Sequence, residues 1–247
     1  MKAMVLAAGL GTRLRPLTDD RPKALVEING RTLLEITLTR LRSFGVSEVI
    51  VNVYHFADMI IGYLAGMQNF GMRIEISREE ELLDTGGGLK KAAWFFLEDV
   101  RDEPFLLHNV DVLSSVDLAQ MARFHDEHHA LATVAVQERR SSRYLLFSEH
   151  GELCGRYFAP ERRTELVRDP EEMDTLAFCG IHVISPRLLR LMSETGAFSI
   201  IATYLRRAAS GEKIIAFRAD GSYWRDLGTP KSLARAEKDL HRGISTI

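Results

Sequence analysis

Residues 1–30 read "MKAMVLAAGLGTRLRPLTDDRPKALVEING", and the beginning of this stretch decides the fold. The run from Ala3 to Ala7 is apolar without interruption and is followed by Gly9 and Gly11. A strand that is apolar on both sides is typical of the middle of a parallel sheet, where helices cover both faces. We therefore predict that the chain begins with a fully buried strand and that a glycine loop leaves its carboxyl end.

The segments after this loop alternate between helix and strand. Leu34, Leu38 and Leu41 recur at helical spacing, so a helix is predicted from about Thr32, with Gly45 at its C-terminal cap. Further strands are predicted at 48–53, at 73–76 and in "PFLLHNVD" (104–111), with helices at 56–65 and 87–97. This rhythm implies right-handed βαβ crossovers and an α/β fold with a doubly wound, mostly parallel sheet.

The second half of the sequence is richer in strands. We predict strands in "ALATVAVQE" (130–138), "SRYLLFSE" (142–149) and "LAFCGIHVIS" (176–185), separated by the turn "EHGE" and by a charged stretch at 161–174. Helices at 186–192 and 200–209, strands "KIIAF" and "SYWRD", and a closing helix from Pro230 follow. Because no linker divides the chain, we expect one domain, 1–247, with a smaller mixed β-rich lobe in 131–247.

The composition is that of an ordinary globular protein. Hydrophobic residues make up 46% and charged residues 27%, and the formal net charge of -2 gives no bulk attraction to nucleic acid or to acidic membranes. No apolar run approaches the roughly 18 residues that span a bilayer, and the first run is too short for a signal peptide, so we expect a cytoplasmic protein. Cys154 and Cys179 form no CxxC pair and are expected to be buried, inert thiols.

The glycine loop is a candidate phosphate site. Glycines at the carboxyl end of a strand let backbone N–H groups approach an anion closely. Neither GxGxxG nor GxxxxGK[ST] occurs, so the motifs of a dinucleotide-binding fold and of a P-loop are not matched. The loop instead carries Arg13, Arg15 and Lys23, a set of cations that suits a polyphosphate, although a solvated basic turn remains the alternative.

Residues 6–23 resemble the N-terminal signature of the sugar nucleotidyltransferase family, approximately L-A-A-G-x-G-T-R-L-x-P-x-T-x-x-x-P-K. Further family marks are "LLDTGGGLKKA" (82–92), "NVD" (109–111), "FCGIHVI" (178–184) and "YWRDLGTP" (223–230). The resemblance implies a Rossmann-like nucleotidyltransferase fold, with 1–130 as the nucleotide-binding half and 131–247 as the sugar-phosphate-binding half. It also implies transfer of a nucleotidyl group from a nucleoside triphosphate to a sugar 1-phosphate, with release of pyrophosphate. Positioning and electrostatic stabilisation can supply most of such catalysis.

The resemblance assigns catalytic roles to two cations and metal-binding roles to two acids. Arg13 is expected to stabilise the leaving pyrophosphate, and Lys23 to lie between the two reacting phosphates. Asp111 and Asp226 are the expected Mg²⁺ ligands, because Mg²⁺ is normally held by one or two carboxylates together with substrate phosphates. Without the motif, each of these acids would be interpreted as a turn residue or a helix cap.

Contacts to the two substrates follow in the same way. The residues expected to bind nucleotide are Leu6, Ala7, Ala8, Gly9, Gly11, Thr12, Glu79, Thr85, Gly86 and Gly87. Glu79 is placed at the base edge, although two further glutamates follow it directly. The three glycines at 86–88 are interpreted as space for a flat ligand at a helix start, the alternative being a plain tight turn. Asn109 and Gly180 are expected on the sugar side.

Two departures from the family pattern concern the sugar phosphate. Val110 stands where relatives commonly have glycine, and the "E-K-P" segment that often bears a second lysine is not visible at 158–168. Arg156, Arg162 and Arg163 are the candidate replacements for that lysine, and the sequence does not choose among them.

The amino-acid sequences of these motifs most resemble those of bacterial N-acetylmuramate-1-phosphate uridylyltransferases, which act in peptidoglycan recycling. A mannose-1-phosphate guanylyltransferase is the closest alternative, and heptose-1-phosphate or phosphocholine enzymes stay open. UTP or GTP and a sugar 1-phosphate are the expected partners. A hypothesis of a different class is a non-catalytic regulatory subunit that binds nucleotide-sugar. The presence of both cations and both acids together favours the enzyme.

Other conspicuous residues are interpreted as ordinary structure. His125, His128 and His129 have a spacing that could ligate zinc, but a solvated helix face is the favoured interpretation. The aromatic run at 94–97 is expected to pack a helix on the sheet. Three arginines, Arg139, Arg140 and Arg143, are predicted to lie in a solvated turn.

Overall fold

One large sheet organises the protein, whose computed structural model describes residues 1–98 and 102–242. Its main path runs β11-β10-β9-β12-β6-β1-β4-β5, while β8 pairs with β12 and β13 pairs with β8. The strands are β1 (Lys2–Leu6), β4 (Glu48–Val53), β5 (Arg73–Arg78), β6 (Phe105–Asn109), β8 (Ala132–Gln137), β9 (Arg143–Ser148), β10 (Leu153–Phe158), β11 (Arg163–Leu166), β12 (Met173–Ile184) and β13 (Ile214–Arg218). Residues 243–247 of the predicted domain lie outside the described part.

The first half of the sheet is parallel, as predicted. Strands β5, β4, β1 and β6 are neighbours in that order, and every pair among them runs parallel. The crossover helices are α1 (Leu33–Ser43), α2 (Ala57–Gly66), α3 (Asp84–Lys91) and α4 (Ala93–Leu97). A parallel sheet that carries helices on both faces is a doubly wound fold, so the predicted fold class is confirmed.

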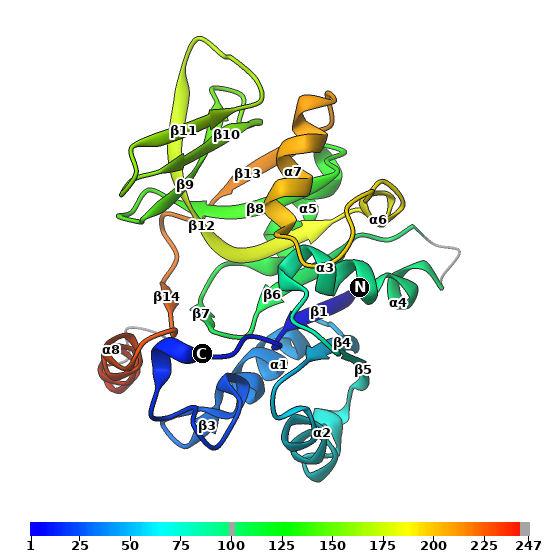
Figure 1. Ribbon diagram of the computed structural model, residues 1–247, viewed down its shortest axis with the longest axis vertical. Helices are drawn as coiled ribbons and strands as arrows, with labels where there is room; N and C mark the ends of the chain where they lie inside the picture. The colour runs from blue at the N-terminus through cyan, green and yellow to red at the C-terminus, as the bar shows by residue number, and fades with distance from the viewer. Residues whose placement is uncertain (99–101, 243–247) are drawn as a thin grey trace.

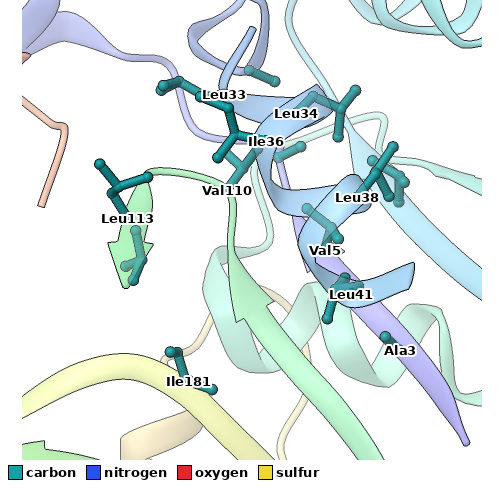
Figure 2. Packing of buried hydrophobic residues seen from close by; sticks show 14 of the residues in the cluster. Ala3, Val5, Leu33, Leu34, Ile36, Leu38, Leu41, Val110, Leu113 and Ile181 are labelled. Carbon is teal, nitrogen blue, oxygen red and sulfur yellow. The ribbon is translucent and has the colours of Figure 1, made fainter. Parts of the chain in front are cut away.

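The alternation of side chains along β1 explains why this strand is apolar throughout. Ala3 and Val5 belong to the core cluster that contains α1, whereas Met4 belongs to the cluster on the opposite face, with Phe95 of α4. Figure 2 shows α1 close to Val5 of β1, and Leu38 and Leu41 of the helix belong to the same cluster as Ala3 and Val5. Because both faces are covered, the run from Ala3 to Ala7 has no polar position.

Local signals fix the ends of α1. The Thr32 hydroxyl accepts a hydrogen bond from the backbone N–H of Glu35 (3.0 Å), which caps the N-terminus. Gly45 adopts a left-handed conformation (φ 80°) just after the helix, and the Val46 N–H donates to the Leu41 carbonyl (3.2 Å). The helix predicted from residue 32 with a glycine cap is therefore confirmed.

The second half of the sheet is antiparallel. The long strand β12 pairs with β6, β8 and β9, and β9, β10 and β11 continue as a meander. In Figure 1 these last three strands form a lobe at the upper left, away from α1 and α2 at the bottom. The sequence interpretation missed β10 and β11, because it assigns no element to 153–158 and treats the charged stretch at 161–174, which contains β11, as a separator. Charged side chains are common on an exposed edge strand, where they oppose pairing with other chains.

The remaining elements close the molecule around the sheet. They are the hairpin β2 (Glu27–Ile28) and β3 (Arg31–Thr32), the ribbon β7 (Val112–Ser114) with β14 (Trp224–Asp226), the helices α5 (Leu118–Glu127), α6 (Arg187–Arg190), α7 (Ile200–Ala209) and α8 (Pro230–His241), and three short 3-10 turns, 12–14, 23–25 and 68–71. Helix α8 begins with a capping box in which Thr229 and Ser232 exchange hydrogen bonds (3.2 and 3.1 Å). Over the described ranges, 1–98 and 102–242, no helix has the length and apolarity that crossing a bilayer requires.

Three local predictions are wrong. The helix expected at 87–97 begins at Asp84 and is interrupted at Ala92. His125 is not solvated: it is buried and hydrogen-bonds to Thr133 and Ser185 (2.9 and 3.0 Å). The sequence interpretation could not foresee this, because His125 stands at helical spacing from His128 and His129, which are both exposed, and nothing local distinguishes it from them.

Arg139 is the third exception. Its guanidinium stacks 3.6 Å above the Trp224 ring and donates to the Phe178 carbonyl (2.6 Å), so it is an internal contact rather than a solvated turn. Arg140 and Arg143 are exposed, as expected, although Arg143 begins strand β9 and is not part of a turn. Both cysteines are buried, and burial raises the pKa of the Cys179 thiol to about 12, so it stays protonated.

Candidate active site

A cavity of about 420 Å³ lies at the carboxyl ends of the parallel strands. Its lining comes from the ends of β1, β4 and β6 and from the segments that follow β1, β5 and β6, together with Ala197: Leu6, Ala7, Ala8, Gly9, Lys23, Asn52, Glu79, Leu82, Asp84, Thr85, Asn109, Val110, Asp111 and Ala197. We call this the first cavity. Open α/β sheets bind ligands at this edge, because the loops that leave adjacent strands separate there.

The loop after β1 folds back so that Lys23 enters the first cavity. Gly11 is left-handed (φ 65°), and its carbonyl accepts a hydrogen bond from the Thr18 hydroxyl (2.9 Å). A Cβ at position 11 would lie only 3.1 Å from the Lys23 Cβ. Gly11 therefore packs inside the loop, against Thr18 and Lys23, and does not line the cavity. Gly9 lines the cavity and has open space around it.

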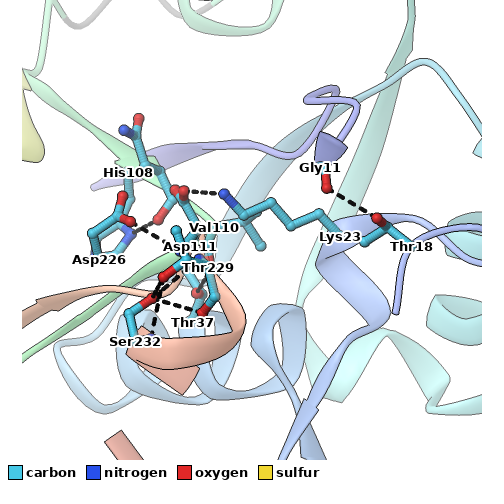
Figure 3. A network of polar contacts seen from close by, with 12 residues as sticks. Gly11, Thr18, Lys23, Thr37, His108, Val110, Asp111, Asp226, Thr229 and Ser232 are labelled. Carbon is cyan, nitrogen blue, oxygen red and sulfur yellow. Dashed lines mark hydrogen bonds and ion pairs between the residues drawn. The ribbon is translucent and has the colours of Figure 1, made fainter. Parts of the chain in front are cut away.

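The two acids lie together although 115 positions separate them in the chain. Asp111 follows β6 closely, and Asp226 is the last residue of β14, opposite Val112 of β7. The backbone N–H of Leu227 donates to the Asp111 carbonyl (2.8 Å), which locks the two segments together. The Lys23 ammonium forms an ion pair with the Asp111 carboxylate, and Figure 3 shows its side chain extended toward that acid, with Asp226 nearby.

Arg13 reaches the same place from outside the first cavity. A Cβ at Gly228 would lie 2.6 Å from the Arg13 guanidinium and 2.7 Å from an Asp226 oxygen. A Cβ at position 228 would displace the guanidinium or the carboxylate, so glycine there lets both side chains keep these positions. Arg13, Lys23, Asp111 and Asp226 therefore form one cluster of alternating charges, which we call the charge cluster.

The acids of the charge cluster fit a magnesium ion by their chemistry. Both offer carboxylate oxygens, and Mg²⁺ needs only one or two protein carboxylates when phosphates and water complete its shell. Within residues 1–98 and 102–242 no group of three or more histidines, cysteines or acids could hold a metal, so a cage made by protein side chains alone is not present there. A metal at Asp111 and Asp226 would depend on substrate phosphates.

Asn52 is a residue of the first cavity that the sequence interpretation missed. It is 2% exposed, accepts a hydrogen bond from the Ala7 N–H (2.8 Å) and donates one to Glu79 (2.6 Å). Glu79 is 4% exposed and also accepts from the Leu83 N–H (3.0 Å). The available signal was a single polar residue inside the otherwise apolar strand "VIVNV".

Other residues of the protein fill the space beside the glycines at 86–88. A Cβ at Gly86 would lie 2.4 Å from the Phe198 ring, and one at Gly87 would lie 2.5 Å from the Gly196 carbonyl oxygen. The N–H groups of both glycines donate to the Phe198 carbonyl (2.9 and 3.2 Å). Neither glycine lines the first cavity, so their size is explained by packing against the segment before α7. Thr85 does line it.

A second cavity of about 310 Å³ adjoins the first. Asp84, Thr85 and Asn109 line both cavities. The other lining residues come from β9, β10, β12 and the start of α7: Arg143, Tyr144, Leu145, Arg156, Tyr157, Phe158, Phe178, His182, Ser199, Ile200 and Ile201. Gly180 is left-handed (φ 74°), and a Cβ there would lie 2.9 Å from the Asn109 amide nitrogen. Gly180 thus lets β12 approach Asn109 where the cavities meet.

Two arginines give the second cavity its positive charge. Arg156 and Arg143 lie on the same side of the β9–β10 pair, because Arg156 is opposite Leu145 and Arg143 is opposite Phe158. Arg156 is paired with Glu165 (2.6 Å), while for Arg143 the described residues provide no ion-pair partner. Of the three candidates for the missing lysine, only Arg156 lines the cavity.

A neutral histidine lies at the second cavity's inner end. His182 Nδ1 is hydrogen-bonded to the hydroxyl of the buried Tyr204 (2.9 Å). Burial, together with the neighbouring His108, lowers the pKa of His182 to about 3. The imidazole is therefore uncharged at neutral pH and contributes a polar contact rather than a third cation.

Comparison with known proteins agrees with this geometry. Residues 2–243 match the family model described as nucleotidyl transferase. The chain is 34% identical to an N-acetylmuramate alpha-1-phosphate uridylyltransferase from Caulobacter vibrioides, with 96% of each protein covered. It is 32% identical to a mannose-1-phosphate guanylyltransferase from Mycobacterium tuberculosis, with 98% of this chain covered but only 65% of the relative.

Solved structures share the fold. A UDP-glucose pyrophosphorylase in complex with UDP-glucose superposes with a TM-score of 0.79 at 20% identity, covering 98% of both chains. The inositol-1-phosphate CTP transferase from T. maritima gives a TM-score of 0.76 at 17% identity, covering 98% of this chain and 95% of the other. At such identities the likeness concerns the arrangement of the backbone.

Proposed function

The chain belongs to the nucleotidyl transferase family and is a sugar-1-phosphate nucleotidyltransferase, and we propose that its two cavities hold the two substrates of a Mg²⁺-assisted reaction. The nucleoside triphosphate occupies the first cavity and the sugar 1-phosphate occupies the second. The observation that carries this proposal is the meeting of both cavities at Asn109, two residues before the Asp111 of the charge cluster.

The charge cluster suits the electrostatics of this reaction. An oxygen of the sugar phosphate forms a bond to the α-phosphorus, and the bond from that phosphorus to the oxygen bridging to the β-phosphate breaks, releasing pyrophosphate. Both reactants are anions, so the main barrier is their repulsion and their alignment. Lys23 reduces the repulsion between the two phosphates, and Arg13 stabilises the departing pyrophosphate.

Asp111 and Asp226 are the residues we propose to hold Mg²⁺. When bound, the ion neutralises phosphate charge that two cationic side chains cannot balance alone. The ion pair between Lys23 and Asp111 keeps this carboxylate and the ammonium in place before substrates arrive. Asp226 is held by the Gly228 N–H (2.9 Å), which fixes one of its oxygens.

The substrates we propose are UTP and N-acetylmuramate 1-phosphate. The similarity to the uridylyltransferase covers both chains almost completely, whereas this chain spans 61–65% of the guanylyltransferases that it matches. N-acetylmuramate carries a carboxylate besides the 1-phosphate, and the second cavity offers Arg143 and Arg156. The proposal places the reaction in the cytoplasm, in the recycling of cell-wall sugars.

GTP with mannose 1-phosphate is the second candidate. The chain is 29–32% identical to several mannose-1-phosphate guanylyltransferases over at least 94% of its own length. The difference between the candidates lies in the sugar as much as in the base, because mannose is neutral.

A substrate panel tests the proposal. The protein is incubated with Mg²⁺, each of four nucleoside triphosphates, and N-acetylmuramate, N-acetylglucosamine, mannose or glucose 1-phosphate, and pyrophosphate release is measured. We expect the highest kcat/KM for UTP with N-acetylmuramate 1-phosphate. A higher value for GTP with mannose 1-phosphate would favour the second candidate, and no turnover with any pair would contradict the proposed reaction.

A further inference from the structure

A buried chain of hydrogen bonds crosses the floor of the first cavity. It runs from the Ala7 N–H to the Asn52 side-chain oxygen, from the Asn52 amide nitrogen to Glu79, and from the other Glu79 oxygen to the Leu83 N–H. The distances are 2.8, 2.6 and 3.0 Å in that order. We call this chain the floor brace. It ties together the loop after β1, the end of β4, and the segment from β5 to α3.

The side chains of the floor brace are almost completely buried, although both line the first cavity. Asn52 and Glu79 are 2% and 4% exposed, respectively, and a Cβ at Gly88 would lie 2.8 Å from both side chains. Gly88 therefore leaves room for the pair, as only glycine can. A buried amide and a buried carboxylate at this distance satisfy each other, and removal of either leaves one buried polar atom of the other without its partner, Glu79 Oε1 or Asn52 Nδ2.

The brace also decides which loop groups are available to a ligand. The Ala7 N–H is used by Asn52, so it cannot donate to a phosphate or to a base. Ala8 and Gly9 follow it in the cavity wall, and no other protein group holds their N–H groups in the described part of the chain. The direction in which these N–H groups point depends on how Asn52 holds Ala7.

From this geometry we infer that Asn52 is a positioning residue for the nucleoside triphosphate. It fixes the loop at Ala7 relative to the base-side acid Glu79, without a bond to the reacting atoms. The inference rests on the proposed occupation of the first cavity by the nucleotide. Sugar phosphate binds in the second cavity, which Asn52 does not line.

Asn52→Asp gives the sharpest test, because it changes one group with almost no change in shape. The variant places two carboxylates within hydrogen-bond distance, so one of them must hold a proton, and the pKa of the pair rises. With the proton bound, an O–H···O contact replaces the amide bond; after its loss, the two acids repel each other. We expect the KM for UTP, relative to wild type at the same pH, to be nearly normal at about pH 5.5 and raised roughly tenfold or more at about pH 8.5.

Two further variants separate positioning from stability. Asn52→Ala should raise the KM for UTP at every pH and leave the KM for sugar 1-phosphate unchanged. His125→Leu is the matched control, since it also removes a buried polar group with two tertiary hydrogen bonds but lies on α5, outside both cavities. We expect His125→Leu to lower the Tm and to leave both KM values as in wild type.

UTP binding by calorimetry, run beside the kinetics with GTP as the second probe, makes the two proposals separable. If wild type binds neither nucleotide, the proposed function fails and the inference fails with it. If wild type binds and turns over, but Asn52→Ala and Asn52→Asp change only the Tm, the inference alone is overturned. Equal shifts of both KM values in Asn52→Ala would overturn it too. A pH-dependent KM for UTP in Asn52→Asp supports it.

Discussion

Substitution of Gly87 by alanine tests whether the triple glycine serves the protein or a ligand. Gly87 lies inside α3, where an alanine would ordinarily stabilise the helix by roughly 0.5–1 kcal/mol. Here the new Cβ would lie 2.5 Å from the Gly196 carbonyl oxygen and 3.0 Å from the Leu83 Cβ. A backbone oxygen cannot rotate away as a side chain can, so α3 and the segment before α7 must separate.

The expected effect is a net loss of stability. Forcing an extra carbon into a packed site costs about 1–3 kcal/mol. After the helical gain is subtracted, we expect a net cost of about 1 kcal/mol, which lowers the Tm by about 2–4 °C in a domain of this size. If the glycine were instead reserved for a ligand, the protein without ligand would gain stability from alanine.

Gly62→Ala is the matched control. Gly62 is an exposed glycine inside α2, and apart from its two chain neighbours and the backbone of its own helix no atom of the described residues lies within 4 Å of the place that a Cβ would take. Here the helical gain of roughly 0.5–1 kcal/mol should appear undiminished and raise the Tm by about 1–4 °C. Thermal unfolding of both variants without nucleotide, followed by circular dichroism, measures the difference. A Gly87→Ala protein at least as stable as Gly62→Ala would refute the packing explanation.

Three more predictions concern the site and the core. Asp111→Asn and Asp226→Asn should each reduce kcat by a factor of about 100 or more with an unchanged circular dichroism spectrum, because charge stabilisation of phosphate is lost; Mg²⁺-dependent activity at the wild-type level in Asp226→Asn would remove that acid from the site. Arg143→Gln should raise the KM for N-acetylmuramate 1-phosphate but not for N-acetylglucosamine 1-phosphate, if the proposed carboxylate contact is made by Arg143 rather than by Arg156; equal changes for both sugars would contradict this. Burial lowers the pKa of His108 and His182 to about 3, so between pH 6.5 and 3 the unfolded chain binds protons that the folded protein does not. Stability should therefore fall as the pH drops through this window, by up to about 1.4 kcal/mol per pH unit for each histidine, and equal urea midpoints at about pH 7 and pH 5 would contradict it.

The parallel half of the fold was predictable because its signals are local. The continuous apolar run at β1 and the leucine spacing of α1 each depend on a few neighbouring residues. The lobe of β9, β10 and β11 was less predictable. Its two outer strands carry charged residues that pair across strands, as Arg156 does with Glu165, and such a pattern resembles a loop when it is read along the chain.

The sequence by itself determined the doubly wound sheet, the glycine loop and the identity of the charged residues that the family motif contains. Only the tertiary structure decided which of them meet. Asp111 and Asp226 come together because β7 and β14 pair across a separation that no local pattern encodes. Asn52 reaches Ala7 and Glu79 because parallel strands bring their carboxyl ends to one edge, whatever their order in the chain. The need for glycine at 86–88 is likewise explained only by the tertiary structure, through the protein groups that pack against these positions.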